Sequence, residues 1–424
     1  MIEDNSQIDA LDDEPKIINK IADDIKEITR PLTIEEVKKV LGITVKHDEA
    51  NKLITFLCML STYTEESQLN ISFRAPSSTG KSHIPIELSE FFPPEDVKKI
   101  GYSSPTSFYH DGTWNEETKQ LILDLERKIL IFLDQPHDEL LKRLRPLLSH
   151  DQKELLYKIT DKGERKGLRT KNVIIRGYPS VIFCTGSLRM DEQEGTRNIV
   201  LSPETSQAKI GEAIALNAKR KGNPLEYRSM LDSSIGRKRL RQRIGLIKEE
   251  KIRYIIINNV EEIADRFIKE NPRLKPRHTR DFGRLIAFIQ MFALLNLWHR
   301  KKTPQNDIYA NEEDIRNGFE LYSQIAESQE LGLSPYVYKI FLEVITPLYK
   351  ECSRGLTKKE VMNRYYDIYG RPIPEWVFKK DIIPALESSG LIYQEEDPND
   401  KRRMLIFLTK PPNTSLPYPK NSLF

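Results

Sequence analysis

The sequence has few cysteines and little excess charge, and each absence excludes a class of protein. Its three cysteines, Cys58, Cys184 and Cys352, lie far apart without metal-ligand spacing. An odd, sparse set of cysteines argues against a disulfide-stabilised scaffold and for a reducing compartment. The net charge is only +3 in 424 residues, so any nucleic-acid surface must come from local clusters of basic residues.

The sequence also lacks a membrane span and a secretion signal. Its most apolar long run, Leu285–Trp298, contains Gln290 and Asn296 and is shorter than the roughly 20 residues that cross a bilayer, so it predicts a buried helix. The acidic start, Met1–Pro15, has neither the basic nor the apolar region of a signal peptide. We therefore expect a globular, cytoplasmic protein with no membrane partner.

Hydrophobic patterning divides the chain into five regions. Thr33 and Glu36 can form a capping box at the start of an N-terminal helix. Apolar runs such as Leu130–Leu133 and Val181–Cys184 predict buried strands of a parallel sheet, so an α/β core is expected. The predicted regions are 1–64 (N-terminal arm and helices), 65–205 (three-layer α/β core), 206–332 (helical region), 333–412 (three helical stretches and two short strands) and 413–424 (irregular tail).

A phosphate-binding motif follows the first strand of the predicted core. The residues Gly80, Lys81 and Ser82 end a segment that lies between a strand and a helix, which is the context of a P-loop. Backbone N–H groups can point at phosphate oxygens, Lys81 adds a charge at the β- and γ-phosphates, and the Ser82 hydroxyl can ligate Mg²⁺. Ala75 at the first position weakens the motif slightly, and a serine-rich turn is the alternative. The residues assigned to this site are Ala75, Pro76, Ser77, Ser78, Thr79, Gly80, Lys81 and Ser82.

An acid at the end of a second buried strand supports this interpretation. Asp134 follows the apolar strand Ile129–Leu133, where it could hold Mg²⁺ beside the P-loop. The two motifs together predict ATP and Mg²⁺ as cofactors. ATP is favoured over GTP because no Asn-Lys-x-Asp segment that reads guanine is present.

Gln135 is the residue that departs from a hydrolysing site. ATPases of this kind normally carry a Glu there to activate the attacking water, and an amide cannot accept that proton. Either the protein hydrolyses ATP poorly by nature, or Gln135 is a Glu→Gln change that traps bound ATP, the explanation that we favour. The nearby acids Asp138 and Glu139 are interpreted as helix-capping residues.

Two further groups could act on the γ-phosphate. Thr185 ends a buried strand that is expected between those of the P-loop and Asp134, and it could contact both the γ-phosphate and water, with Ser187 in reserve. Arg197 could reach a neighbouring subunit's γ-phosphate, and Arg189 is its competitor. The alternatives are an ordinary strand-end turn and a surface arginine.

In this order, the P-loop, the acidic strand, the threonine-bearing strand and the arginine resemble an AAA+ ATPase. An expected hairpin before Thr185, spanning Leu155–Ile175, resembles the pre-sensor hairpin of the clade that includes the minichromosome maintenance helicases and superfamily 3 helicases. In those rings the hairpin contacts the DNA backbone in the central channel. The resemblance implies that role for Lys162, Arg165 and Lys166, with a solvated loop tip as the alternative.

A second resemblance lies in Arg277–Ala287, which is similar to the lid helix of minichromosome maintenance helicases. Arg280 matches their sensor 2 arginine, and Arg284 is the alternative. The similarity covers about 65–330 without the large oligonucleotide-binding N-terminal domain, as in shorter helicases of plasmids, viruses and mobile elements. It implies an AAA+ core with a helical lid, and a hexamer that uses ATP to move along single-stranded DNA during replication.

Three helical stretches and two strands at the C-terminus fit a winged-helix domain. Its third helix, beginning at Pro374–Phe378, would enter a DNA groove. Lys379 and Lys380 would be exposed on it, Arg402 would lie at the wing edge, and Trp376 is expected in the domain core. Such domains bind DNA or proteins, and we favour DNA.

The role of the basic cluster Arg237–Arg243 stays open. It could be a solvated helix face, part of a subunit interface or part of a DNA path. The function is open too. The main alternative to a motor is an ATP-dependent DNA-binding switch or loader that assembles on DNA without unwinding it. A third option is a regulatory NTPase whose C-terminal domain reads an operator.

Overall fold

Short apolar strands pair in parallel to form the central sheet. The computed structural model describes residues 22–101, 103–104, 111–161, 169–188 and 192–409. The five-stranded central sheet has the order β2-β5-β8-β1-β9. All residues of β1, β5, β8 and β9 are buried, as expected for a parallel sheet that is covered on both faces, so the predicted α/β core is confirmed. The strands are β1 (Asn70–Arg74), β2 (Val97–Ile100), β5 (Ile129–Phe132), β8 (Ser180–Thr185) and β9 (Ile199–Leu201).

The two faces of this sheet are covered differently, because side chains alternate along each strand. Ile129 and Ile131 of β5 join the largest apolar core, which includes α3, α11 and α12. Leu130 and Phe132 face the other way and pack with α5 and the second sheet. The helices around the core are α2 (Ile34–Leu41), α3 (Glu49–Leu60), α4 (His83–Ser89), α5 (Asp138–Leu148), α6 (Glu192–Arg197), α11 (His278–Leu295) and α12 (Glu312–Glu330), with short 3-10 turns η1 (Ser61–Tyr63), η2 (Pro94–Asp96) and η4 (Leu297–His299).

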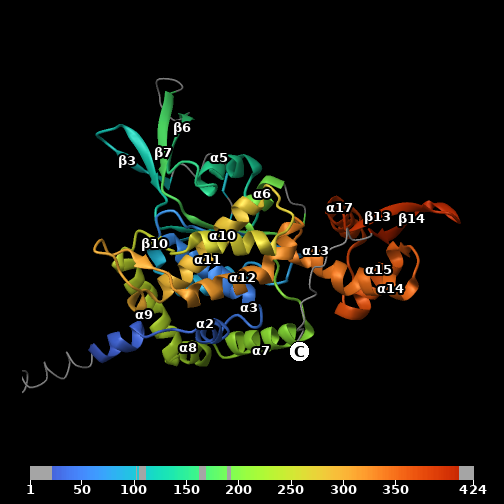
Figure 1. Ribbon diagram of the computed structural model, residues 1–424, viewed down its shortest axis with the longest axis horizontal. Helices are drawn as coiled ribbons and strands as arrows, with labels where there is room; N and C mark the ends of the chain where they lie inside the picture. Colours follow the sequence, from blue (N-terminus) through green and yellow to red (C-terminus); the bar gives the residue numbers. More distant parts are fainter. Residues whose placement is uncertain (1–21, 102, 105–110, 162–168, 189–191, 410–424) are drawn as a thin grey trace, which may run out of the picture.

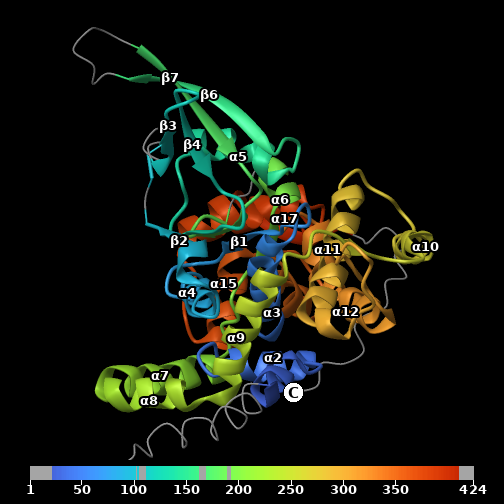
Figure 2. The same ribbon diagram turned by 90° about the vertical axis from the view of Figure 1, so that its left-hand side faces the viewer.

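A second sheet projects from one end of the molecule (Figures 1 and 2). The predicted hairpin is confirmed as the antiparallel pair of β6 and β7, in which Asp161 pairs with Arg169. The pair β3–β4, which was not predicted, adds to it because β4 pairs in parallel with β7. Residues 162–168 lie outside the described residues, so Lys162, Arg165 and Lys166 stay predictions. The strands are β3 (Thr113–Asn115), β4 (Gln120–Asp124), β6 (Glu154–Asp161) and β7 (Arg169–Arg176).

The region after β9 is largely helical, as predicted, and α7 and α8 lie at the end opposite the hairpin (Figures 1 and 2). The apolar run Leu285–Trp298 falls in α11 and η4 and is largely buried. None of the described helices is long and apolar enough to cross a membrane. A small parallel strand pair was not predicted. The further elements are α7 (Gln207–Gly222), α8 (Pro224–Ser233), α9 (Ile235–Glu250), β10 (Ile255–Ile256), α10 (Val260–Glu270) and β11 (Ile308–Tyr309).

The C-terminal unit has its own apolar core and a small antiparallel sheet of order β12-β14-β13. Thr357 caps α15 through a capping box with Glu360, as Thr33 caps α2 with Glu36. The two predicted strands are longer than expected, and β12 was not predicted. The elements are α13 (Pro335–Ile340), η5 (Phe341–Ile345), α14 (Thr346–Cys352), β12 (Leu356–Thr357), α15 (Lys358–Tyr369), α16 (Glu375–Val377), η6 (Phe378–Ile382), α17 (Ile383–Ser388), β13 (Ile392–Asp397) and β14 (Asp400–Leu408).

The prediction that Trp376 lies in the core of this unit is wrong. Its side chain is 63% exposed, whereas Phe378, Ile382 and Leu386 are buried. The segment η6 is π-helical, so one extra residue enters the turn between Trp376 and the residues that follow. That insertion rotates Trp376 out of the helix face that the α-helical spacing had assigned to it.

The Arg237–Arg243 cluster is not a uniformly solvated face. Arg237 and Arg243 are 7% and 2% exposed. Arg243 donates to the carbonyls of Ile28 (2.6 Å), Arg30 (2.8 Å) and Leu295 (2.8 Å), which ties the N-terminal segment to α11. Burial lowers the pKa of Arg243 to about 10. These two arginines are therefore structural, a possibility that the sequence did not suggest.

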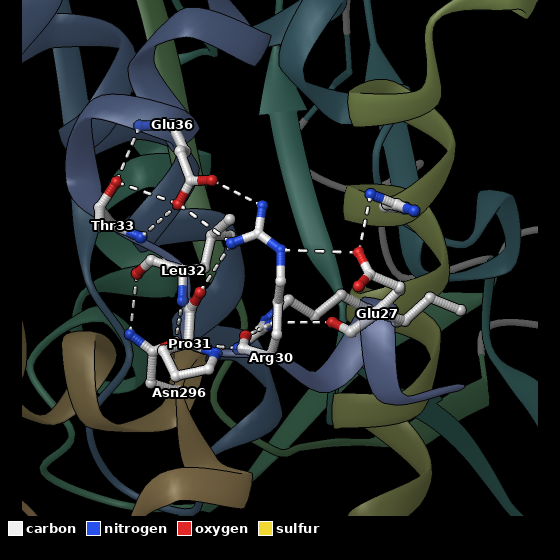
Figure 3. A network of polar contacts seen from close by, with 10 residues as sticks. Glu27, Arg30, Pro31, Leu32, Thr33, Glu36 and Asn296 are labelled. Atoms are coloured by element: carbon white, nitrogen blue, oxygen red, sulfur yellow. Dashed lines mark hydrogen bonds and ion pairs between the residues drawn. The ribbon is translucent and has the colours of Figure 1, made fainter. Parts of the chain in front are cut away.

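Figure 3 shows the polar network around this junction. Arg30 pairs with Glu36 at 2.6 Å, and Glu27 lies within 3.9 Å of its guanidinium. Asn296 accepts from the Leu32 amide (2.9 Å) and donates to the Leu32 carbonyl (3.0 Å). The chain before α2 is therefore held against the end of α11 by paired backbone and side-chain groups.

Replacement of Arg243 by alanine is expected to lower the free energy of unfolding by about 3 kcal/mol, because it leaves several buried carbonyls without donors. Chemical denaturation would measure the loss. Arg241→Ala is the matched control, because Arg241 is exposed on the same helix, and its change should stay within about 0.5 kcal/mol. Equal losses in the two variants would contradict a structural role specific to Arg243.

Candidate functional site

The loop after β1 is a turn with two residues in the left-handed backbone region. It runs from Ala75 to Ser82, and α4 begins at His83. Ser78 and Gly80 have φ angles of +64° and +94°, and the latter favours a glycine. The Lys81 ammonium donates to the Pro76 carbonyl at 2.8 Å, so it lies against the loop. All eight residues assigned from the sequence thus belong to one continuous turn.

Asp134 lies at the same edge of the same sheet as this loop. The strand β8 separates β5 from β1, as predicted, and the carboxyl ends of parallel strands share one edge. The Ser82 hydroxyl is 3.4 Å from the Leu133 carbonyl, directly before Asp134. Burial lowers the pKa of Lys81, and the Asp134 carboxylate opposes that shift. A cation, a hydroxyl and a carboxylate therefore converge around one position.

These groups fit a Mg²⁺ ion that is shared with phosphates. Mg²⁺ is usually held by one or two carboxylates, water and substrate phosphates, not by a cage of protein ligands. Ser82 and Asp134 supply that kind of incomplete set. The described residues contain no group of three or more His, Cys, Asp or Glu side chains that could hold a metal ion.

Gln135 and Thr185 are joined by a direct hydrogen bond. The Thr185 hydroxyl donates to Gln135 Oε1 at 2.6 Å and accepts from the Ser187 amide at 3.1 Å. The backbone N–H of Gln135 donates to Asp134 Oδ1 at 2.8 Å. The threonine-bearing strand end and the acidic strand end therefore form one hydrogen-bonded unit beside the P-loop.

Arg74 is a residue of this site that the sequence interpretation missed. It ends β1 directly before the P-loop and is 3% exposed. It lines a narrow cavity with Gln135, Thr185 and Arg197, and its Nη1 donates to the Ser187 carbonyl at 3.3 Å. The available signal was a single charged residue at the end of a strand that is otherwise uncharged.

A cavity of about 460 Å³ opens on the other side of the P-loop. Ser78, Thr79 and Gly80 form one wall, and the others come from the segment around Thr44, from α7 and from the C-terminal unit. Its volume lies in the usual range for small-molecule sites, about 300–1,000 Å³. The sequence did not predict it, because its walls come from segments far apart in the chain. The non-loop lining residues are Thr44, Val45, Lys46, Asp48, His83, Ile84, Glu204, Thr205, Lys209, Ile210, Ala213, Ile214, Leu216, Asn217, Arg220, Tyr227 and Arg371.

Arg197 and Arg280 line one cavity, and Arg197 also borders the narrow cavity of Gln135 and Thr185. Because Ile199 of β9 pairs with Ile71 of β1, the backbone of Arg197 lies at the amino end of the sheet and the P-loop is at the carboxyl end. Arg197 donates to the Ser149 hydroxyl (2.6 Å), and Arg280, exposed on α11, donates to the Thr196 hydroxyl (2.7 Å).

The two arginines share a cavity of about 220 Å³ with Arg284. Arg284, the alternative sensor, is buried and is tied to Asp281 (2.7 Å) and to the carbonyls of Thr196 and Asn198 (both 2.9 Å). It is therefore part of the core packing, whereas Arg280 has an exposed side chain. Arg189 lies outside the described residues.

The predicted DNA-contacting cations of the C-terminal unit are exposed. Lys379, Lys380 and Arg402 all lie at the surface. Lys379 pairs with Glu375 at 2.5 Å, and the exposed Trp376 lies on the same helical stretch. A flat aromatic beside cations is a surface that suits nucleic acid, because bases can stack on it.

Comparison with protein-family models and with curated proteins found no match for this chain.

Proposed function

We propose that the chain is an ATP-dependent, ring-forming enzyme of the AAA+ type that acts on DNA. The observation that carries the proposal is the convergence of Lys81, Ser82 and Asp134 at one edge of a parallel sheet, beside the pair Thr185–Gln135. In this role Lys81 meets the β- and γ-phosphates, and Ser82 and Asp134 hold Mg²⁺. The metal would neutralise charge on the transferred phosphoryl group.

The cavity beside the P-loop supports a nucleotide rather than a simple phosphate. It adjoins Ser78, Thr79 and Gly80 of the loop, and Val45, Ile210 and Ile214 give it an apolar lining. A purine needs such an apolar surface, with a few polar groups to orient it. ATP is the nucleotide that we propose, in line with the sequence.

A ring would complete the site from a second subunit. Arg280 is exposed on α11 in the cavity near the start of β1, away from its own P-loop, so it would reach the γ-phosphate held by a neighbour. Arg197 borders both that cavity and the one with Gln135 and Thr185. A guanidinium supplied from outside the loop stabilises the charge that develops on the phosphoryl group. We propose a hexamer on this basis.

DNA would meet the ring at two places. The hairpin β6–β7 projects from the core (Figure 2), and its tip carries the predicted contacts to single-stranded DNA. The C-terminal unit, proposed to be a winged helix, presents Trp376, Lys379 and Arg402. Replication of a mobile element by a DNA helicase is the activity that this combination suits.

The second candidate function is a switch or loader that assembles on DNA with ATP. It is favoured by Gln135, whose amide oxygen accepts the Thr185 hydroxyl and which has no group that can take a proton from water. In this form ATP would bind and hold an assembly in place without rapid turnover.

ATP binding tests the proposal directly. The protein should bind a fluorescent ATP analogue with Mg²⁺, and chelation of Mg²⁺ by EDTA should weaken binding by about tenfold or more, about 1.4 kcal/mol. Asp134→Asn should reduce the effect of Mg²⁺, because it removes the carboxylate. Asp138→Asn is the control, since Asp138 lies in the first turn of α5. Binding that is indifferent to both Mg²⁺ and Asp134 would refute the shared metal site.

A further inference from the structure

Arg371, between α15 and α16, lines the same cavity as the P-loop residues Ser78, Thr79 and Gly80. Its Nε donates to the Tyr365 hydroxyl at 3.1 Å. Its Nη2 is buried and has no hydrogen-bond partner in the part of the chain that the structure describes. The C-terminal unit thus brings a guanidinium to the edge of the candidate nucleotide site with one donor unused.

A buried donor on a charged group is costly unless it has a partner, and the best partner for a guanidinium is an anion. Two other cations of this cavity are already paired: Lys209 with Asp48, and Arg220 with Glu87 at 2.9 Å. Arg371 has no ion-pair partner among the described residues. An anionic ligand in the cavity would supply the hydrogen-bond acceptor that Nη2 lacks.

We propose that Arg371 donates to the phosphates of the nucleotide held by the P-loop of the same chain. This inference rests on the proposed ATP site and assigns it a residue that no sequence motif marked. The guanidinium enters from the C-terminal unit, so bound nucleotide would bridge that unit and the α/β core.

A chain of hydrogen bonds links Arg371 back to the start of the P-loop. The Tyr365 and Tyr336 hydroxyls are 2.9 Å apart. The Tyr336 amide donates to Ser202 Oγ (3.1 Å). The Ser202 hydroxyl in turn donates to the Arg74 carbonyl (2.6 Å), directly before Ala75. A bound nucleotide would therefore contact both ends of this hydrogen-bonded chain. It would hold the C-terminal unit against the α/β core in the observed position.

Arg371→Ala should weaken binding of Mg²⁺-ATP by the full-length protein about 10- to 100-fold, the usual range for a lost charge-assisted hydrogen bond. Displacement of a fluorescent ATP analogue by inorganic triphosphate should weaken by a similar factor, because the contact is with phosphate. Arg371→Lys should recover part of the affinity, since it keeps the charge and loses the planar fork. Arg403→Ala is the control, because Arg403 is 67% exposed on β14 and pairs only locally, with Asp400.

Amide hydrogen exchange distinguishes contact with the nucleotide from a purely structural role of Arg371, because only the contact makes protection of residues 365–371 depend on ATP. ATP should slow exchange in residues 365–371 of the unsubstituted protein. In Arg371→Ala this protection should be lost even at ATP concentrations that still protect the P-loop. An Arg371→Ala protein that binds ATP and triphosphate like the unsubstituted chain would overturn the inference while leaving the ATP site intact. If instead the unsubstituted chain fails to bind ATP, or Lys81→Ala binds it equally well, the proposed function itself fails.

Discussion

Replacement of Lys81 by alanine is expected to weaken ATP binding by about 100-fold or more, enough to abolish it at micromolar nucleotide. The Lys81 ammonium lies over the P-loop at 2.8 Å from the Pro76 carbonyl, at the edge that also holds Asp134. Without it, the β- and γ-phosphates would meet the Asp134 carboxylate with one less compensating charge. Two strong charge-assisted contacts of about 1.5 kcal/mol each account for a loss of this size. Equilibrium titration with a fluorescent ATP analogue would measure it.

The matched control is Lys142→Ala, because Lys142 is an exposed lysine on α5. It should bind ATP like the unsubstituted protein. Both variants should keep their unfolding midpoints, since the Lys81 side chain fills no apolar core position. A Lys81→Ala protein that binds ATP within a factor of about two of the unsubstituted chain would remove the P-loop from the mechanism, and the ring proposal with it.

Replacement of Gln135 by glutamate is expected to raise the rate of ATP hydrolysis by about 100-fold or more, the usual contribution of a general base. One carboxylate oxygen could keep the 2.6 Å hydrogen bond from Thr185. The second oxygen would then be able to accept a proton from the attacking water, which the amide cannot do. Phosphate release in the presence of single-stranded DNA would measure the change in turnover.

Gln135→Ala serves as the control for Gln135→Glu, since it removes the side chain without adding a base and should leave turnover at its low level. Equal turnover in all three proteins would mean that Gln135 is not at the catalytic position. Strand displacement by Gln135→Glu then separates the two candidate functions. Unwinding that is lost when Lys162, Arg165 and Lys166 are neutralised supports a motor, whereas tight ATP-dependent DNA binding without unwinding supports a loader.

The positions of the candidate site residues could be predicted from the sequence because each motif lies within a few residues of a strand end. The P-loop follows β1 and Asp134 follows β5, so buried strands fix where both groups emerge. The order of these strands was also predictable, since Thr185 was expected on a strand between the other two and β8 lies there. The capping box at Thr33 was recognised for the same reason, because its partner Glu36 is three residues away.

Other expectations, on which side chains are buried, failed because the packing of the folded chain differs from what the local sequence pattern indicated. Trp376 was assigned to the core from α-helical spacing, but a π-helical turn changes that spacing by one residue. Arg243 looked like part of a surface cluster, yet its donors satisfy carbonyls of Ile28, Arg30 and Leu295. The exposure of Trp376 and the burial of Arg243 cannot be predicted from a few neighbouring residues, because both depend on which segments pack beside the helix.

The sequence by itself determined the α/β core, the turn between β1 and α4 and the place of Asp134 at the same sheet edge, because covalent spacing and burial of apolar strands decide these features. Only the tertiary structure decided that Arg371 lines a cavity with the P-loop and that Arg197 and Arg280 share another. These residues are separated by up to hundreds of positions in the chain. Their proximity follows from how the helical region and the C-terminal unit pack on the core, and no local spacing records that packing.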